Sequence, residues 1–177
     1  MSRARVATTW LDACSGCHMS FLDIDERILE IAPLIELVYS PLVDSKEFPE
    51  DVDVTLVEGA VSSEADVEEI LDIRKKTKVL ISFGDCAVSA NVPAMRNRYD
   101  SKEVLDRSYM ENATNNNHRP DKNIPKLMKV ARPVHEFVKV DVFLQGCPPP
   151  ADAIYSALTQ LLAGEHPELN GKTRFGA

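Results

Sequence analysis

The chain has 177 residues, of which 44% are hydrophobic and 27% are charged, and its formal net charge is −8. A chain of this length fits one domain, and no apolar run in it approaches the roughly 20 residues that a membrane span needs. We therefore expect no membrane span. Because its Lys and Arg residues are dispersed instead of gathered on one basic face, we also expect no nucleic-acid binding.

The first forty residues predict a strand, a helix and a second strand. Residues 5–11 read as a short strand, and apolar residues recur at helical spacing over 20–32. Pro33 would end that helix, because proline lacks the backbone donor and clashes with the preceding turn. A second strand is expected over 35–39.

The middle of the chain repeats this alternation. Residues 52–59 are rich in β-branched and apolar residues, as in a strand. Ser62 and Ser63, with the acidic residues that follow, predict the cap and first turn of a helix that runs to about Lys76. Residues 78–84 form a nearly continuous apolar run, which is typical of a strand buried on both faces.

The last part of the chain adds one strand and one helix. Residues 140–146 repeat the buried-strand pattern, and 151–164 place apolar residues on one helical face. Strands that alternate with helices predict an α/β fold, flavodoxin-like and doubly wound, with a mainly parallel sheet and helices on both faces. We expect a single domain over 1–177 with a long insertion at about 100–135, either disordered or a partner-binding surface.

Each of the four cysteines follows a predicted strand. Cys14 and Cys17 come after the first strand, and Cys86 and Cys147 follow the two apolar runs. Since the carboxyl ends of parallel strands lie along one edge of a sheet, where open α/β proteins bind ligands, the four thiols are expected to converge. Four convergent thiolates hold either a tetrahedral metal ion or an iron–sulfur cluster.

Glycines beside the cysteines favour the cluster. Gly16, Gly84 and Gly146 each lie within two residues of a cysteine. Because glycine has no Cβ, we expect these positions to let backbone N–H groups approach the sulfurs closely. Such donors, together with the N-termini of the helices that follow, would stabilise an anionic cluster and raise its reduction potential.

Other chemistries stay open for these cysteines. Structural zinc usually takes two short-spaced pairs, and only Cys14 and Cys17 form one here. The same pair followed by His18 matches c-type haem attachment, and a C-x-x-C beside an α/β pattern matches a thioredoxin-like redox motif. Both leave Cys86 and Cys147 without a role. Buried structural cysteines are a further alternative, but it does not explain why all four stand at strand ends.

The motifs around the cysteines resemble those of the small subunit of nickel–iron hydrogenases. That family carries C-x-G-C-x-x-S, Gly-x-Cys and Gly-Cys-Pro-Pro in this order, and here they stand at 14–20, 84–86 and 146–149. Residues 8–23 and 140–154 extend the resemblance to the short small subunit of the bidirectional NAD-reducing hydrogenases.

The resemblance implies that this chain is a subunit of a hydrogen:NAD+ oxidoreductase and relays electrons without a catalytic residue of its own. A large subunit would hold the Ni-Fe centre, and diaphorase subunits with FMN and further iron–sulfur clusters would pass the electrons to NAD. The implied ligands of one 4Fe-4S cluster in this chain are Cys14, Cys17, Cys86 and Cys147.

Two polar residues near the cysteines carry narrower expectations. Glu58 resembles the Glu of a Glu-Gly pair that the family places near the cluster. It is therefore either a group beside the cluster or on a proton path, or simply a polar residue that closes a strand. For His18 we expect a polar contact at the subunit interface.

Two other functions are weighed against the hydrogenase. The matching cluster subunit of respiratory complex I resembles this domain, but it has adjacent cysteines where this chain spaces Cys14 and Cys17. A flavin-binding electron carrier shares the flavodoxin-like fold, but cysteines occupy the loop where its phosphate would bind. Since the N-terminal residues lack the apolar region of a secretory signal, we expect a cytoplasmic protein.

Overall fold

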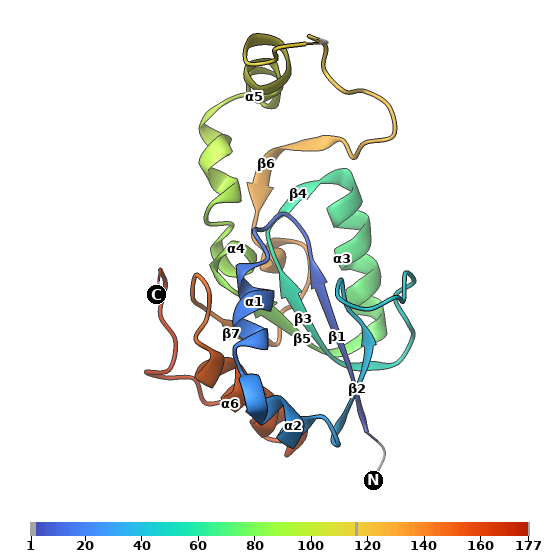
Figure 1. Cartoon of the computed structure of the whole chain (residues 1–177), viewed down its shortest axis with the longest axis vertical. Coiled ribbons are helices and arrows are strands. Elements are labelled where there is room, and N and C mark those ends of the chain that lie inside the picture. The colour runs from blue at the N-terminus through green and yellow to red at the C-terminus, as the bar shows by residue number, and fades with distance from the viewer. Residues whose placement is uncertain (1–2, 116, 177) are drawn as a thin grey trace.

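The computed structural model describes residues 3–115 and 117–176, and it shows an α/β fold around a parallel sheet (Figure 1). In spatial order, the strands of this sheet are β2 (Ile35–Tyr39), β1 (Ala4–Trp10), β3 (Val52–Glu58), β5 (Thr77–Phe83) and β7 (Val142–Leu144). Every neighbouring pair is parallel. Counted along the chain, this order is 2-1-3-4-5, which is the flavodoxin-like order. The predicted fold class is confirmed.

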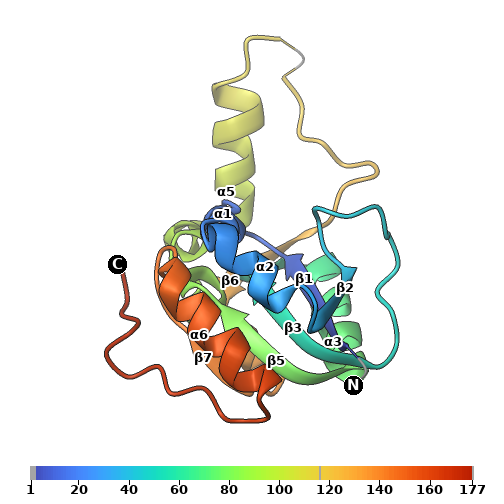
Figure 2. The same ribbon diagram turned by 60° about the horizontal axis from the view of Figure 1, so that its bottom comes forward.

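Helices cover both faces of the sheet (Figure 2). The helical segments on one face are α1 (Gly16–Leu22), η1 (Asp25–Arg27), α2 (Ile28–Ile31) and α6 (Ala151–Leu162). Those on the other face are α3 (Glu64–Lys76), α4 (Asp85–Ser89) and η4 (Val134–Glu136). Successive strand residues serve the two cores, because side chains alternate across a strand: Leu56 packs toward α1 and α6, and Val57 packs toward α3.

The single helix expected over 20–32 is wrong in its bounds. The helical run begins earlier, at Gly16, and it is interrupted after Leu22. Asp25 has a φ of 55°, in the left-handed region that Asp tolerates better than most residues and that cannot continue an α-helix. The apolar residues of the predicted pattern still face the core on both sides of this break, because Ile24 and Ile31 are both fully buried.

The insertion contains regular structure. It follows η2 (Pro93–Arg98) and comprises α5 (Ser101–Asp106), the π-helical η3 (Arg107–Glu111) and a return through β6 (Leu127–Arg132). β6 pairs antiparallel with the short β4 (Val61–Ser63), a two-stranded sheet that the sequence did not predict. In Figures 1 and 2, α5 and the segment after it project from the body as an arm, here residues 100–115 and 117–126. Helices and a strand therefore account for residues 101–111 and 127–132 of this insertion.

Within the described residues, no helix is both long and apolar enough to cross a membrane. The N-terminal cap predicted for α3 is confirmed at Ser63. Its side-chain oxygen accepts the backbone N–H of Asp66 at 3.1 Å, and the Asp66 carboxylate accepts the Ser63 backbone N–H at 2.8 Å. This reciprocal pair satisfies two donors that the helix itself leaves unpaired.

Replacing Ser63 by Ala should lower the free energy of unfolding by about 1 kcal/mol, because the cap loses its side-chain acceptor. The shift of the urea midpoint at constant slope measures this change. Ser108→Ala is the control: Ser108 lies in the arm and donates only to the Val104 carbonyl of its own helix. It should stay within about 0.5 kcal/mol of wild type. Equal shifts in both variants would contradict the capping role.

Candidate metal centre

The four cysteines meet where neighbouring strands end. Trp10, Glu58, Phe83 and Leu144 form one registered row across β1, β3, β5 and β7. The loops after β1, β5 and β7 carry the thiols, and together these line one cavity at that edge; the lining includes Cys14, Cys17, Cys86 and Cys147, with Glu58 and Asp85 beside them. The predicted convergence is therefore present in the fold.

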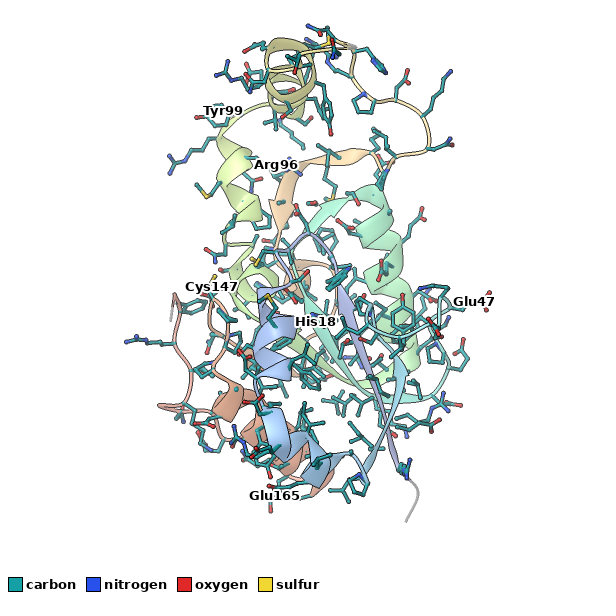
Figure 3. The ribbon with its side chains drawn as sticks, viewed as in Figure 1. His18, Glu47, Arg96, Tyr99, Cys147 and Glu165 are labelled. Atoms are coloured by element: carbon teal, nitrogen blue, oxygen red, sulfur yellow. The ribbon has the colours of Figure 1, made fainter. Side chains whose placement is uncertain are left out.

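The cavity runs from the core to the surface. Cys17 and Cys86 are buried in the first turns of α1 and α4, whereas Cys14 and Cys147 are exposed in loops. Figure 3 shows Cys147 toward the edge of the molecule, and His18 closer to its middle on α1. A group held by all four sulfurs would be anchored inside and accessible outside.

The negative groups at the cavity favour the binding of a positively charged metal centre. Burial raises the pKa of the Cys17 thiol, and the negative charges of Glu58 and of the other three cysteines raise it further. Burial also raises the pKa of Cys86 to about 11, and the backbone N–H of Val92 opposes that shift. Without a positive charge the two inner cysteines stay protonated. Because metal ions bind thiolates, a metal centre would supply the charge that makes four thiolates favourable here.

The donor set of the cavity matches the ligands of an iron–sulfur cluster. Four cysteines line it, and a 4Fe-4S cluster takes four thiolates on separate irons. Within residues 3–115 and 117–176, no group of three or more His, Cys, Asp or Glu side chains is arranged to hold a single metal ion. The residues present therefore fit the ligand set of such a cluster.

Two glycines of the site donate their own N–H groups to oxygen atoms. Gly84 donates its N–H to the Leu144 carbonyl and Gly146 to the Asp85 carboxylate, both at 2.8 Å. The expectation that glycine lets backbone N–H groups approach the sulfurs stays a prediction. These two glycines provide room. Gly84 has a φ of 83°, and a Cβ there would overlap Cys17 Sγ. Gly146 has a φ of 135°, and a Cβ there would overlap the backbone of Pro149.

A buried polar network adjoins the cysteines. Glu58 is 1% exposed and His18 is 3% exposed. The Glu58 carboxylate accepts the backbone N–H of His18 at 3.1 Å and also pairs with its Nδ1, while Nε2 lies 2.9 Å from Thr8 Oγ1. Thr8 in turn donates to Ser40 Oγ at 2.9 Å. The interface contact expected for His18 is wrong, because the imidazole turns inward to a buried carboxylate.

Two residues that the sequence did not single out complete the site. Asp85 is buried and accepts the N–H of Gly146 at 2.8 Å and that of Gly176 at 2.7 Å, so it joins the start of α4 to the loop after β7 and to the C-terminal segment. Its position between Gly84 and Cys86 was the available signal. Asn91 Nδ2 lies 3.5 Å from Cys147 Sγ, and no local pattern marks it.

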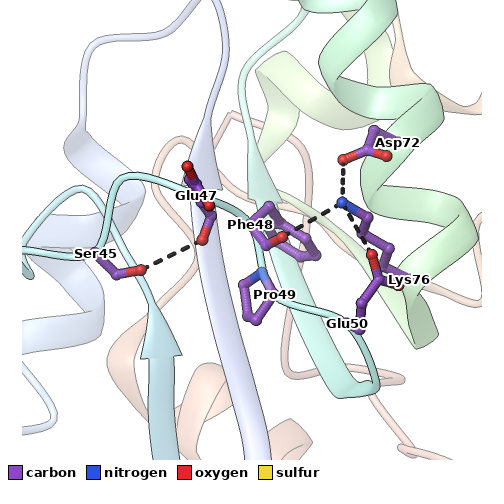
Figure 4. A pocket seen from close by; sticks show the side chains of 7 residues that line it. All are labelled: Ser45, Glu47, Phe48, Pro49, Glu50, Asp72 and Lys76. Atoms are coloured by element: carbon purple, nitrogen blue, oxygen red, sulfur yellow. Dashed lines mark hydrogen bonds and ion pairs between the residues drawn. The ribbon is translucent and has the colours of Figure 1, made fainter.

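A larger cavity of about 730 Å³ lies elsewhere, between the 45–50 loop and α3 (Figure 4). Lys76 Nζ in it lies 2.8 Å from Asp72 and 3.3 Å from Glu50, and it also donates to the Phe48 carbonyl. Since its cation is already paired by its own acidic lining, we assign this cavity no chemistry.

Comparison with known proteins places the site in a family context. The family model of the NADH ubiquinone oxidoreductase, 20 Kd subunit, matches residues 14–161. One subunit of the vhu F420-non-reducing hydrogenase of Methanocaldococcus jannaschii is 41% identical over 95% of this chain and 59% of that protein. The chain thus spans less than two thirds of that relative's length.

Two further matches cover more of the other protein. The delta subunit of the NAD-reducing hydrogenase HoxS of Cupriavidus necator is 41% identical over 92% of this chain and 80% of that subunit. A chain in the crystal structure of an NAD+-reducing NiFe hydrogenase in the H2-reduced state superposes with a TM-score of 0.94. It is 36% identical and the match covers 98% of this chain and 99% of that one.

Gly84→Ala should prevent assembly of the metal centre, because the added methyl group occupies the space of Cys17 Sγ. We expect iron to fall from about four atoms per chain, the content of a 4Fe-4S site, to near zero after anaerobic purification. Gly164→Ala is the matched control, since Gly164 also has a positive φ, 79°, but a Cβ there meets nothing within 4 Å. It should keep its iron despite a backbone strain of about 1–2 kcal/mol. Full iron content in both variants would contradict this view of the site.

Proposed function

We propose that this chain, which belongs to the family of the NADH ubiquinone oxidoreductase 20 Kd subunit, is the electron-transferring small subunit of an NAD-reducing nickel–iron hydrogenase. The observation that carries the proposal is the cavity lined by four cysteines at the carboxyl edge of the sheet. The similarity to subunits of hydrogenases supports the choice of enzyme.

The four cysteines would hold one 4Fe-4S cluster, which supplies reversible one-electron transfer when bound. Cys17 and Cys86 would anchor it on the sheet side, and Cys14 and Cys147 on the outer side. Glu58 would stand beside it as a buried carboxylate. The side chains around it exclude water on the inner side, and the exposed pair leaves one side open for exchange with a partner.

Exposed apolar side chains in the segments that follow Cys17 and Cys86 support a partner at this face. Met19 on α1 is 65% exposed, and Val92 and Met95, which follow α4, are 57% and 69% exposed. Large apolar residues that gather near a functional site are typical of surfaces covered by another protein. A partner seated there would shorten the distance that each electron must cross.

The proposed division of labour is the one that the resemblance to hydrogenase small subunits implies. Oxidation of hydrogen releases two electrons and two protons, and reduction of NAD+ takes two electrons and one proton. We propose that the hydrogen chemistry lies in a large subunit with the Ni-Fe centre and that diaphorase subunits with FMN, iron–sulfur clusters and NAD complete the reaction. This chain contributes no catalytic residue, passes the electrons singly, and works in the cytoplasm.

A complex I-type cluster subunit is the second candidate, and the description of the family favours it. In that subunit, two cysteines that are adjacent in the sequence would both have to bind the cluster. Here Cys14 lies in a loop and Cys17 in the first turn of α1, and this spaced pair supports the hydrogenase.

Cys147→Ser should lose or convert the cluster and abolish hydrogen-dependent NAD reduction in the assembled complex, because a hydroxyl replaces one of four thiolates. Diaphorase activity with artificial acceptors should stay at the wild-type level, which is the internal control. The direct measurements are iron, acid-labile sulfide and zinc content, with the EPR spectrum of the dithionite-reduced protein. We expect about four irons and four sulfides in the wild type.

Two outcomes would count against the proposed function. Full coupling of hydrogen oxidation to NAD reduction in the Cys147→Ser complex would remove the cluster from the electron path. One zinc per chain with no sulfide in the wild type would make the cysteines structural.

A further inference from the structure

The turn that follows α4 directs two N–H groups at cysteine sulfurs. α4 ends at Ser89, and residues 90–92, here the donor turn, lead into η2. Asn91 Nδ2 donates to Cys147 Sγ at 3.5 Å, and the backbone N–H of Val92 faces the Cys86 thiol. The donor turn therefore reaches one inner and one outer cysteine at the same time.

The donor turn is held in place by its surroundings. Ala90 has a φ of 61°, a left-handed conformation that is unfavourable for alanine, and it is buried against Ala60 and Ala131. Its N–H donates to the Cys86 carbonyl at 2.9 Å, and its carbonyl accepts the N–H of Ala94 at 2.9 Å. Strained backbone that persists between such fixed contacts is common at functional sites.

Two backbone amides near the sulfurs are already paired with oxygen atoms. The N–H groups of Gly84 and Gly146 donate to oxygen atoms, as described above. A thiolate accepts hydrogen bonds and cannot donate, so the Asn91 amide must present its nitrogen to Cys147. Hydrogen bonds to the sulfurs of an iron–sulfur cluster stabilise the more negative, reduced state and so raise its reduction potential.

We propose that Asn91 tunes the reduction potential of the cluster through its hydrogen bond to Cys147. This inference rests on the proposed function. Asn91 acts through a ligand and is not itself a ligand or a catalytic residue.

The position of Asn91 links this tuning to assembly. Asn91 and Cys147 are exposed in the isolated chain, so water competes for the amide. The exposed apolar side chains of Val92 and Met95 follow directly. A partner that covers them removes this water and strengthens the bond, because the local dielectric falls. The contribution of Asn91 to the potential is then larger in the complex than in the free subunit.

The test is an EPR-monitored redox titration of the anaerobically purified complex with two variants. Asn91→Leu keeps a similar volume without a donor, and its potential should be more negative than that of the wild type. Asn91→Asp keeps the shape and places a negative charge at the sulfur, so its potential should fall further. Asn112→Leu changes an exposed asparagine on the arm and should leave the potential unchanged. Iron and sulfide should stay at wild-type content in all three.

The results separate this inference from the proposed function. A wild-type protein without iron and sulfide overturns the proposed function, and the tuning role with it. Full cluster content with unchanged potentials in Asn91→Leu and Asn91→Asp overturns the tuning role alone. If Asn91→Leu loses its cluster, Asn91→Asp decides: a cluster at the wild-type potential in that variant overturns the inference, and a more negative potential supports it.

Discussion

Parallel pairing of β1, β3, β5 and β7 is the constraint on which the candidate site depends. The hydrogen-bonded register aligns Trp10, Glu58, Phe83 and Leu144, the last residues of these strands, in one row. Cysteines far apart in the chain can then share a cavity without any local structure that brings them together. A shift in the register of one strand would move one sulfur away from the others, so the sheet and the site are not independent.

The cavity combines features that are unfavourable in an ordinary core. Two buried thiols and a buried carboxylate share a small volume, and burial raises the pKa of both inner cysteines. Ser15, which follows Cys14, and Ala90, in the turn after the helix of Cys86, both adopt left-handed conformations that residues other than Gly, Asn and Asp seldom use. Such a concentration of desolvation and strain is expected where function is built into a fold, since a bound cofactor can offset what the empty site costs.

The residues around the site form a buried inner part and an exposed outer part. On the inner side, His18, Glu58 and Thr8 form a hydrogen-bonded network that joins α1 to the sheet and fixes the helix that carries Cys17. On the outer side, Asn91 and the apolar residues Val92 and Met95 are exposed. The first part holds α1 against the sheet, and the second leaves the cavity accessible from outside.

The α/β class, the strands that precede the cysteines and the Ser63 cap could all be predicted from the residues alone, because they depend on local periodicity and on neighbouring residues. The convergence of the four thiols could be predicted too, since parallel strands end at a common edge. The inward orientation of His18, the space left by Gly84 and Gly146, and the contact of Asn91 with a sulfur are seen only in the folded chain. Those contacts join residues distant along the chain, 40 positions apart for His18 and Glu58 and 56 for Asn91 and Cys147. No local pattern encodes such a pair, because the two residues meet only when separate segments of the chain pack on the sheet.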